Sequence, residues 1–156
     1  MGLTLREVTG KDIDLLFRWA NDPMVRQNAF HTEQIPYETH RTWFVKMLAD
    51  RDVLKYILCS ISNTGEMQDI GQIRLSIEDG EALIDYSIAP EKRGQGFGTR
   101  MILMAEEKLR ELRTDVIYCK GQVKIENIAS AKAFEKCGYD LEKREKYLEF
   151  SKRIRS

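Results

Sequence analysis

The stretch Ile84-Asp85-Tyr86-Ser87-Ile88-Ala89-Pro90-Glu91-Lys92-Arg93-Gly94-Gln95-Gly96-Phe97-Gly98-Thr99 decides the fold of this chain. It begins as an apolar strand pattern, breaks at Pro90 and passes through three glycines into a helical pattern. The apolar residues of that helix recur about every 3.6 residues: Phe97, Met101, Met104, Ala105, Leu109 and Leu112. A strand, a glycine loop and a helix in succession form an anion site, because glycines admit a phosphate and the first helical N–H groups point at it.

The glycine spacing excludes two common nucleotide loops. Gly94-x-Gly96-x-Gly98 is not the dinucleotide fingerprint, because Thr99 stands where its third glycine belongs, and no Gly-Lys-Ser/Thr follows as a P-loop requires. The stretch instead resembles the pyrophosphate loop of the GNAT acetyltransferases, Arg/Gln-x-x-Gly-x-Gly/Ala. Arg93, Gly96 and Gly98 occupy the matching positions.

A second stretch strengthens the resemblance. Asn127-Ile128-Ala129-Ser130-Ala131-Lys132-Ala133-Phe134-Glu135-Lys136-Cys137-Gly138-Tyr139 is similar to the closing motif of the same family, in which an Asn starts a helix that ends in Gly-Phe or Gly-Tyr. The order of the two motifs, their separation and their strand–helix context all match. The resemblance covers residues 3 to roughly 145.

The resemblance implies the GNAT fold, an α/β (α+β) domain with a mixed central sheet, a splayed strand pair and helices on both faces. The periodicity of the chain gives the same order of elements independently, within a single domain spanning residues 1–156. Besides the central strand, we expect strands at 3–8, 53–61, 70–77, 116–123 and beyond Tyr139. We expect a helix with Ile13, Leu16 and Phe17 inward, a short turn from Pro23, and a helix from near Pro36 that buries Trp43, Phe44, Met47 and Leu48.

Acetyl-CoA is the co-substrate that the resemblance implies. The backbones of Ile88 and Ala89 would bind the pantetheine arm, and one of their N–H groups would polarise the thioester carbonyl. The backbone of residues 94–99 would hold the pyrophosphate, with Arg93 adding charge. The residues of that loop are Gly94, Gln95, Gly96, Phe97, Gly98 and Thr99. Asn127 would reach the pantetheine arm, whereas Ser130 is either a ligand or a simple helix cap.

Phe134 departs from the family pattern, in which many members carry a tyrosine that protonates the departing thiolate. Phenylalanine cannot donate a proton. We therefore expect Phe134 to pack near the thioester end of the cofactor. Another group or water then protonates the sulfur, or the thiolate leaves unaided, since its reference pKa is only about 8.5.

The reaction also requires a base, because an ammonium ion cannot attack a carbonyl. Asp85 lies between apolar neighbours in the central strand, and it is either this base or the structural partner of a lysine across the sheet. His31, Glu78 and Glu33 are the alternatives. The two histidines, His31 and His40, are not at metal-ligand spacing, and we predict no metal.

The acceptor region is predicted between residues 18 and 44, which are rich in hydrogen-bonding and aromatic groups. Most of these side chains suit a solvated or packed helix pair, but the order of Trp, Asn-Asp-Pro, Arg and a later His-x-x-Trp-Phe is similar to that in nucleotide-sugar N-acetyltransferases. The closest likeness is to those that acetylate the 4-amino group of a UDP-linked amino-deoxy sugar in pseudaminic acid biosynthesis. The residues proposed to bind this substrate are Arg18, Asn21, Arg26, Phe30, His31 and Arg41, and Trp19 is a further ring that could stack on a base or sugar.

Two other functions remain open from the sequence. One is a protein acetylase of the ribosomal N-terminal kind or an aminoglycoside-type acetylase. An acidic acceptor region would favour these, yet the charges between residues 11 and 50 are balanced, at five basic against six acidic. The other is a non-catalytic acetyl-CoA-binding module, for which the missing tyrosine is the only indication.

The overall composition sets the class of protein. Lys and Arg together number 25, as do Asp and Glu, so nothing indicates nucleic acid or an anionic membrane surface as a partner. No apolar run is long enough to span a bilayer, and no signal peptide is evident. The three cysteines lack CxxC spacing, which favours buried thiols in a reducing cytoplasm. We expect a cytoplasmic enzyme with a small-molecule amine acceptor; the oligomeric state stays open, a homodimer included.

Overall fold

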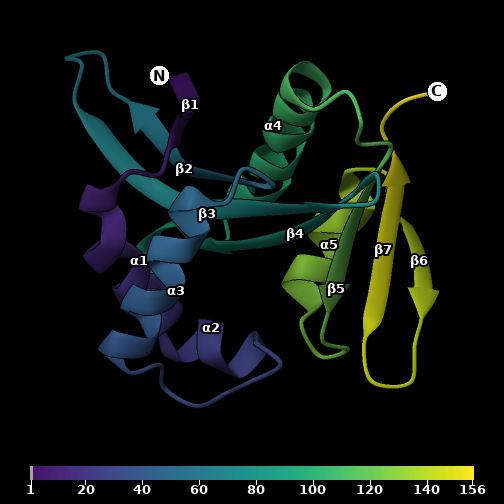
Figure 1. Cartoon of the computed structure of the whole chain (residues 1–156), viewed down its shortest axis with the longest axis horizontal. Helices are drawn as coiled ribbons and strands as arrows, with labels where there is room; N and C mark the ends of the chain where they lie inside the picture. The colour runs from purple at the N-terminus through teal and green to yellow at the C-terminus, as the bar shows by residue number, and fades with distance from the viewer. Residues whose placement is uncertain (1) are drawn as a thin grey trace.

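The computed structural model describes residues 2–156. Seven strands form one mixed sheet in the order β1-β2-β3-β4-β5-β7-β6 (Figure 1). The strands are β1 (Gly2–Glu7), β2 (Val53–Ile61), β3 (Met67–Glu78), β4 (Glu81–Ile88), β5 (Tyr118–Val123), β6 (Asp140–Lys143) and β7 (Leu148–Arg153). The helices are α1 (Ile13–Ala20), α2 (Pro23–Asn28), α3 (Tyr37–Ala49), α4 (Phe97–Leu112) and α5 (Ile128–Lys136).

The mixed sheet with helices on both faces confirms the predicted fold class. The turn expected at Pro23 is a short helix, α2, whose first turn is capped by the Asp22 carboxylate accepting from the Val25 N–H at 3.2 Å. The chain beyond Tyr139 forms two strands that pair with each other as a hairpin. Strand β5 begins at Tyr118, two residues later than expected from the sequence.

Alternation along the strands divides the sheet into two faces. One face carries the larger core, which includes Leu75, Ile84 and Phe150 and is covered by α4 and α5. The other face carries a smaller core around Ile57 and Cys59 beneath α1 and α3. Figure 1 shows α4 on the opposite side of the sheet from α1 and α3.

Helix α4 buries most of the predicted stripe, with Phe97 and Met104 partly buried against the core, and differs at Ile102, Glu106 and Leu112. Its buried residues are Met101, Ile102, Ala105, Glu106 and Leu109, whereas Leu112 is 54% exposed. Glu106 is only 1% exposed because Lys152 and Tyr139 satisfy it: the Lys152 Nζ lies 2.7 Å from Oε1, and the Tyr139 hydroxyl donates to Oε2 at 2.9 Å. A buried carboxylate is tolerated only with such partners.

Helix α3 also corrects the sequence prediction. Phe44 and Met47 are buried as expected, but Leu48 is half-buried and Trp43 is 37% exposed. The stripe that faces the sheet follows His40, Phe44 and Met47, and Trp43 lies about 100° away from Phe44 around the helix. The buried His40 Nε2 lies 2.9 Å from the Ile13 carbonyl oxygen and donates to it, which joins α3 to α1.

Beyond the area covered by α1 and α3, the same side of the sheet is polar. We call this surface the polar sheet face: Gln72, Arg74, Asp85, Ser87 and Lys120, which are all half-buried or exposed. Their neighbours at intervening positions point into the larger core. The strands beneath this surface therefore alternate between apolar and polar residues, as expected for a sheet with one open face.

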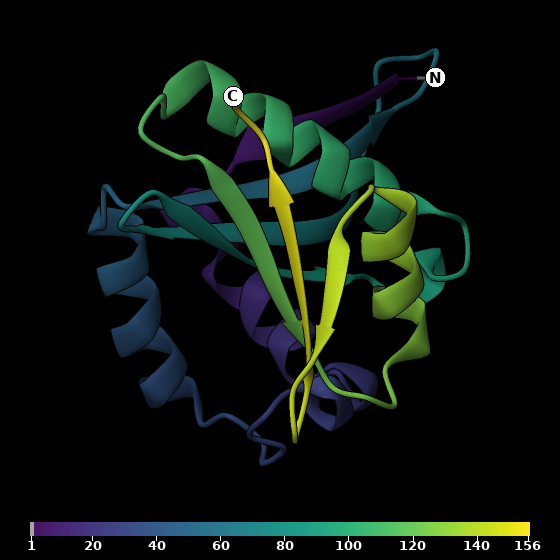
Figure 2. The same cartoon turned by 90° about the vertical axis from the view of Figure 1, so that its right-hand side faces the viewer.

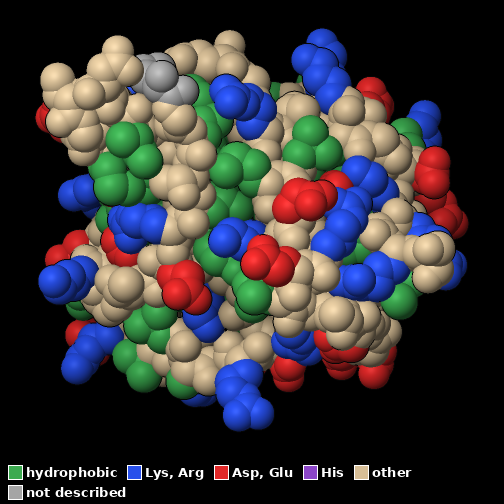
Figure 3. Space-filling view, turned by 90° about the horizontal axis from the view of Figure 1, so that it is seen from above, with side chains coloured by type: hydrophobic (Ala, Val, Ile, Leu, Met, Phe, Trp, Pro, Cys, Tyr) green, Lys and Arg blue, Asp and Glu red, His purple; other side chains and the backbone are tan. Residues whose placement is uncertain are grey.

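Two properties of the surface bear on possible partners. No helix within residues 2–156 combines the length and the apolar character needed to cross a membrane. On the face seen in Figure 3, acidic and basic side chains are interspersed rather than gathered into a field of one sign.

Candidate active site

The central feature of the site is a fork between two parallel strands. Strand β4 pairs with β3 along its whole length, up to Ile88 opposite Gly71. Its pairing with β5 ends at Leu83 opposite Lys120, and beyond this point the two strands separate. Figure 2 shows β5 and β7 running steeply across the strands behind them. This fork is the splayed pair expected from the sequence.

At the end of β4, the two N–H groups predicted to bind the cofactor, those of Ile88 and Ala89, point in different directions. The Ala89 N–H already donates to the Ile70 carbonyl oxygen at 2.8 Å. Because N–H groups alternate in direction along an antiparallel ladder, the Ile88 N–H points away from β3, toward the side of the fork. Ile88 is therefore the donor that faces the fork, and Ala89 belongs to the sheet.

The glycine loop precedes α4 with an open backbone surface. Gly94 and Gly96 have φ of 77° and 80°, a left-handed conformation that L side chains rarely adopt. A Cβ built on either residue would meet no heavy atom within 4 Å. Gly96 is also the N-cap of the 16-residue helix α4, whose first N–H groups come from residues 97–99. This cradle has the shape and the dipole needed for a pyrophosphate.

Gly98 also has a packing role. A Cβ at Gly98 would lie 3.2 Å from Cε2 of Tyr86, so the glycine lets α4 approach β4 closely. The Tyr86 hydroxyl donates to Ser130 Oγ at 3.0 Å, and the Ser130 N–H donates to Asn127 Oδ1 at 3.3 Å. Burial raises the pKa of Tyr86, so the phenol stays protonated at neutral pH. The three elements β4, α4 and α5 meet at this hydroxyl pair.

Phe134 lies in the core rather than at the surface of the site. Its ring is 1% exposed and stacks on Phe150, with ring centroids 5.3 Å apart. A Cβ at Gly121 would lie 2.3 Å from Cζ of this ring, so the ring tip is pressed against β5. Phe134 thus has a packing role, and its ring also contacts Tyr86 with centroids 6.0 Å apart, so its place near the thioester end of the cofactor stays a prediction.

Arg93 is directed away from the cradle. Its guanidinium forms an ion pair with Asp22, the N-cap of α2. Burial alone would raise the pKa of Asp22, but hydrogen bonds from Arg93 and the Val25 N–H outweigh it, and the pKa lies below its ordinary value. Arg93 thus joins the glycine loop to the predicted acceptor region, and its expected contribution to pyrophosphate binding stays a prediction.

Two residues predicted to bind the acceptor hold the chain between α1 and α3 in place. The Asn21 amide donates to the Ile35 carbonyl at 2.9 Å and accepts from the Ile35 N–H at 2.7 Å. Arg26 donates to the Ala20 carbonyl at 2.7 Å and to the His31 carbonyl at 2.8 Å. These contacts use side chains that the sequence prediction gave to the substrate.

The other predicted acceptor residues are more accessible. Arg18 and Arg41 are exposed, and Arg41 makes only a 3.7 Å contact with Glu38. Phe30 is 52% exposed and packs edge-on against Tyr147 of the β6–β7 hairpin, with ring centroids 6.0 Å apart. His31 is exposed beside it.

Trp19 differs, because it is 9% exposed and belongs to the smaller core. Its ring is therefore not available to stack on a base or sugar.

The predicted bases have different locations. Glu78 pairs with Glu81 at the far end of the β3–β4 hairpin, roughly 24 Å along the strand from Ile88, which is too far for it to act there. Asp85 forms an ion pair with Arg74 directly across the strands, the second of the two arrangements considered from the sequence, with an arginine in place of the lysine. Glu33 is exposed, and only its backbone carbonyl contacts Arg26.

Within residues 2–156, no group of three His, Cys, Asp or Glu side chains is arranged to hold a metal ion.

Sequence reasoning missed two residues of this region. Asp22 entered only as part of the Asn-Asp-Pro string, and Arg74 was not singled out. A signal for Arg74 exists, because Gln72, Arg74 and Ser76 alternate with Ile73 and Leu75 and so indicate an uncovered strand face. No sequence signal pairs Asp22 with Arg93, since the two are 71 residues apart.

Comparisons with known proteins agree with the fold described above. Residues 2–140 match a family model described as an acetyltransferase (GNAT) domain. No curated protein matches the sequence. A domain from Methanocaldococcus jannaschii superposes with a TM-score of 0.85 at 20% identity, covering 97% of this chain and 98% of that one.

Two solved structures with named activities are also similar. Spermidine N-acetyltransferase from Vibrio cholerae, in complex with CoA and spermine, gives a TM-score of 0.81 at 19% identity, covering 97% of this chain and 95% of that one. AAC(6′)-Ib with acetyl-CoA gives 0.78 at 18% identity, covering 98% and 94%. At these identities the likeness establishes the fold.

Proposed function

The chain belongs to the acetyltransferase (GNAT) domain family, and from this premise we propose that it is an acetyl-CoA-dependent N-acetyltransferase acting on a primary amine of a small molecule. The amine nitrogen attacks the thioester carbonyl carbon, the C–S bond breaks, and the products are an N-acetyl amine and the CoA thiol. The observation that carries this proposal is the open glycine cradle at the N-terminus of α4, beside the fork of β4 and β5.

Each part of the site has a physical task in this reaction. The N–H groups of residues 94–99 bind the pyrophosphate, and the Ile88 N–H donates to the thioester oxygen as negative charge develops there. The Tyr86 hydroxyl donates to Ser130 and leaves the Ser130 hydrogen available for the departing sulfur. Asn127 caps α5 next to this group.

The proton of the attacking ammonium needs a separate acceptor. Asp85 is already paired with Arg74, and Glu78 is remote. We assign the proton to the exposed His31 or to water on the polar sheet face. A drop in kcat for His31→Ala would identify the imidazole as the proton acceptor, and an unchanged kcat would identify water. A drop for Asp85→Asn alone would return the role to Asp85.

For the acceptor, we propose a UDP-linked amino-deoxy sugar. A polycation would need unpaired carboxylates, and three of those on and around the polar sheet face have partners within the chain, although Glu33 in the predicted acceptor region has none for its carboxylate among residues 2–156. Asp85 pairs with Arg74, Glu81 with Lys120 at 2.9 Å, and Glu149 with Arg144 at 2.6 Å. The second candidate is an aminoglycoside or polyamine, which the names of the structural relatives favour.

The cofactor site is tested by calorimetry with acetyl-CoA. Gly96→Val places a side chain in the open cradle and should lower the affinity for acetyl-CoA at least tenfold. Gly65→Val is the matched control, because Gly65 has a similar φ of 84° and equally open space, but lies in the β2–β3 turn. Equal affinity in the wild type and Gly96→Val would refute the placement.

The acceptor is tested by thiol release in a panel of amines. The panel contains a UDP-linked 4-amino sugar, spermidine, kanamycin and peptides with free N-termini. We expect the UDP-linked sugar to give the highest kcat/KM. Preference for spermidine or kanamycin would select the second candidate, preference for peptides would select a protein acetylase, and absence of turnover with bound acetyl-CoA would indicate a binding module.

A further inference from the structure

Arg74 is held in a fixed orientation at the centre of the polar sheet face. Its guanidinium carbon lies 4.7 Å from the centroid of the Trp43 ring, and one of its terminal nitrogens contacts Asp85 on the neighbouring strand. Stacking on an aromatic ring and pairing with a carboxylate together fix both the plane and the rotation of the group. An arginine held in this way is pre-organised for recognition.

The contact with Asp85 uses only part of the donor capacity of Arg74. A guanidinium carries five N–H donors, and the bond to Asp85 is the only hydrogen bond that Arg74 makes through its side chain to residues 2–156. The side chain is 25% exposed, so the remaining donors are reachable from solvent. Planar groups of this kind bind phosphate and carboxylate oxygens with two parallel hydrogen bonds.

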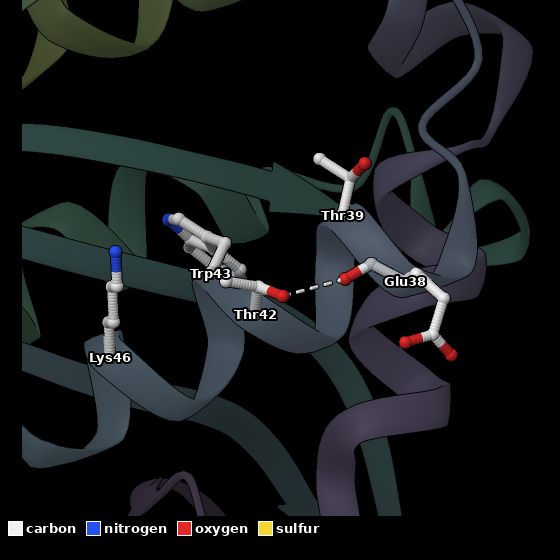
Figure 4. A pocket seen from close by; sticks show the side chains of 5 residues that line it. All are labelled: Glu38, Thr39, Thr42, Trp43 and Lys46. Carbon is white, nitrogen blue, oxygen red and sulfur yellow. Dashed lines mark hydrogen bonds between the residues drawn. The ribbon is translucent and has the colours of Figure 1, made fainter.

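Next to Trp43, the exposed side of α3 forms an open, shallow surface. Its residues are Glu38, Thr39, Thr42, Trp43 and Lys46. In Figure 4, Trp43 and Lys46 project from α3 on the same side, whereas Glu38 points elsewhere. Trp43 thus belongs to this surface and also supports Arg74.

The charged side chains beside this surface balance one another in number. Glu38 and Lys46 line it, and Arg74 is matched by Asp85. The preference for an anion therefore rests on the remaining N–H groups of Arg74, because a guanidinium offers hydrogen-bond donors and no acceptor.

The distance from Arg74 to the fork limits the kind of anion. Arg74 is opposite Asp85, which is three residues before Ile88 on β4, so its backbone position lies roughly 10 Å along the strand from the N–H that faces the fork, and its guanidinium stands off the sheet against Trp43. In an α-amino acid the amine and carboxylate share one carbon and cannot span this separation. An amine and a phosphate on opposite sides of a sugar ring can.

We infer that Arg74, supported by Trp43 and tethered by Asp85, binds a phosphate group of the acceptor, placed across a ring-sized spacer from the reacting amine. This inference rests on the proposed acetyl transfer at the fork. It assigns to Arg74 on β3 a role for which the sequence offered Arg18, Arg26, His31 and Arg41.

Kinetics with matched acceptors test the inference. A UDP-linked 4-amino sugar and the same amino sugar without UDP are compared in the wild type, Arg74→Gln and Arg74→Lys. Gln keeps a stem that can pack on Trp43. We expect Arg74→Gln to raise the KM of the UDP-linked sugar at least tenfold, with kcat and the KM of acetyl-CoA changing less than threefold. Arg74→Lys should recover part of the loss, and the sugar without UDP should not respond to either change.

The control variant is Arg113→Gln, which removes another ion-paired arginine, located between α4 and β5. It should leave all kinetic constants within threefold of the wild type. An unchanged KM in Arg74→Gln, or an equal loss for both sugars, would overturn the inference while the proposed acetyl transfer stands.

A binding measurement separates the inference from the proposed function. The protein is saturated with CoA, so that the glycine cradle is occupied, and titrated with UDP by calorimetry. The wild type should bind UDP and Arg74→Gln should bind it at least tenfold more weakly. Absence of UDP binding to the wild type would overturn the inference, whereas failure of acetyl-CoA to bind, or of any amine to release thiol, would overturn the proposed function.

Discussion

At the scale of single residues, two side chains on different elements bear on how the departing thiolate receives its proton. Phe134 lacks a hydroxyl, and its ring tip is packed against Gly121 in the core. Ser130 has a hydroxyl, and because the Tyr86 phenol donates to it, its own hydrogen is not needed for that bond. A hydroxyl that donates to a developing thiolate gives a charge-assisted hydrogen bond, typically about 1.5–3 kcal/mol.

We predict that Ser130→Ala lowers kcat by about tenfold to a hundredfold, the range that this bond energy gives. Acetyl-CoA affinity should change less than threefold, as measured by calorimetry. Ser130→Thr keeps the hydroxyl and is the control.

Phe134→Tyr should not raise kcat, and it should lower the free energy of unfolding by about 1–3 kcal/mol, because the added oxygen has no room at β5. A hundredfold gain in Phe134→Tyr would show that the tyrosine position still governs this step.

At the scale of elements, the glycine loop and α2 are joined by one partly buried ion pair. Asp22 caps α2 and binds Arg93, and their side chains are 13% and 27% exposed. The segment that follows α2 is fixed by Asn21 and Arg26 through backbone contacts. The loop that would hold the cofactor is therefore mechanically linked to the wall of the acceptor region.

We predict that Asp22→Asn separates the two roles of this carboxylate. Asn is as good an N-cap as Asp, so α2 should persist, but the charge that orients Arg93 is lost. The KM of the acceptor should rise at least threefold, while acetyl-CoA affinity stays within threefold in both Asp22→Asn and Arg93→Gln. A double-mutant cycle on unfolding free energies should give a coupling of about 1 kcal/mol.

The ion pair between Asp115 and Arg113 provides the matched control. Asp115→Asn should not affect either substrate. A tenfold loss of acetyl-CoA affinity in Arg93→Gln would mean that Arg93 contacts the pyrophosphate after all, as first expected from the sequence.

At the scale of the whole molecule, the interior holds several groups that resist ionisation. Burial raises the pKa of Cys59, Cys119 and Cys137 from 9.0 to about 11. Burial also raises the pKa of Tyr139, whose hydroxyl donates to the buried Glu106. The thiols are therefore weak nucleophiles at neutral pH, and Cys119 is a core residue rather than an acyl carrier.

These shifts predict a loss of stability in alkali. Between about pH 9 and 11, the folded protein keeps thiol protons that the unfolded chain has released. The unfolded state thus binds fewer protons, and the free energy of unfolding falls as pH rises, by up to about 1.4 kcal/mol per pH unit for each thiol. Urea unfolding from about pH 8 to 10.5 should show a decrease of at least about 2 kcal/mol, with a smaller slope in Cys119→Ala. A pH-independent free energy over this range would contradict the prediction.

The sequence by itself determined the order of elements and the position of the glycine cradle. Residues 84–99 specify a strand, a turn and a helix through local spacing, and the structure has them where the pattern predicts. Such patterns are informative because apolar periodicity and glycine conformations depend on neighbours within a few residues. The second motif likewise located α5, with Asn127 as its cap.

Only the tertiary structure decided which side chains remain available for a ligand. Arg26, Arg93 and Phe134 had chemically sensible roles in the sequence, but each also has an internal partner. Arg74 was inconspicuous in the sequence, and the structure pairs it with Asp85 and stacks it on Trp43 at the polar sheet face. The reason is physical: local spacing fixes the direction of a side chain on its own element, whereas its partner comes from a distant element that the folded sheet brings opposite to it.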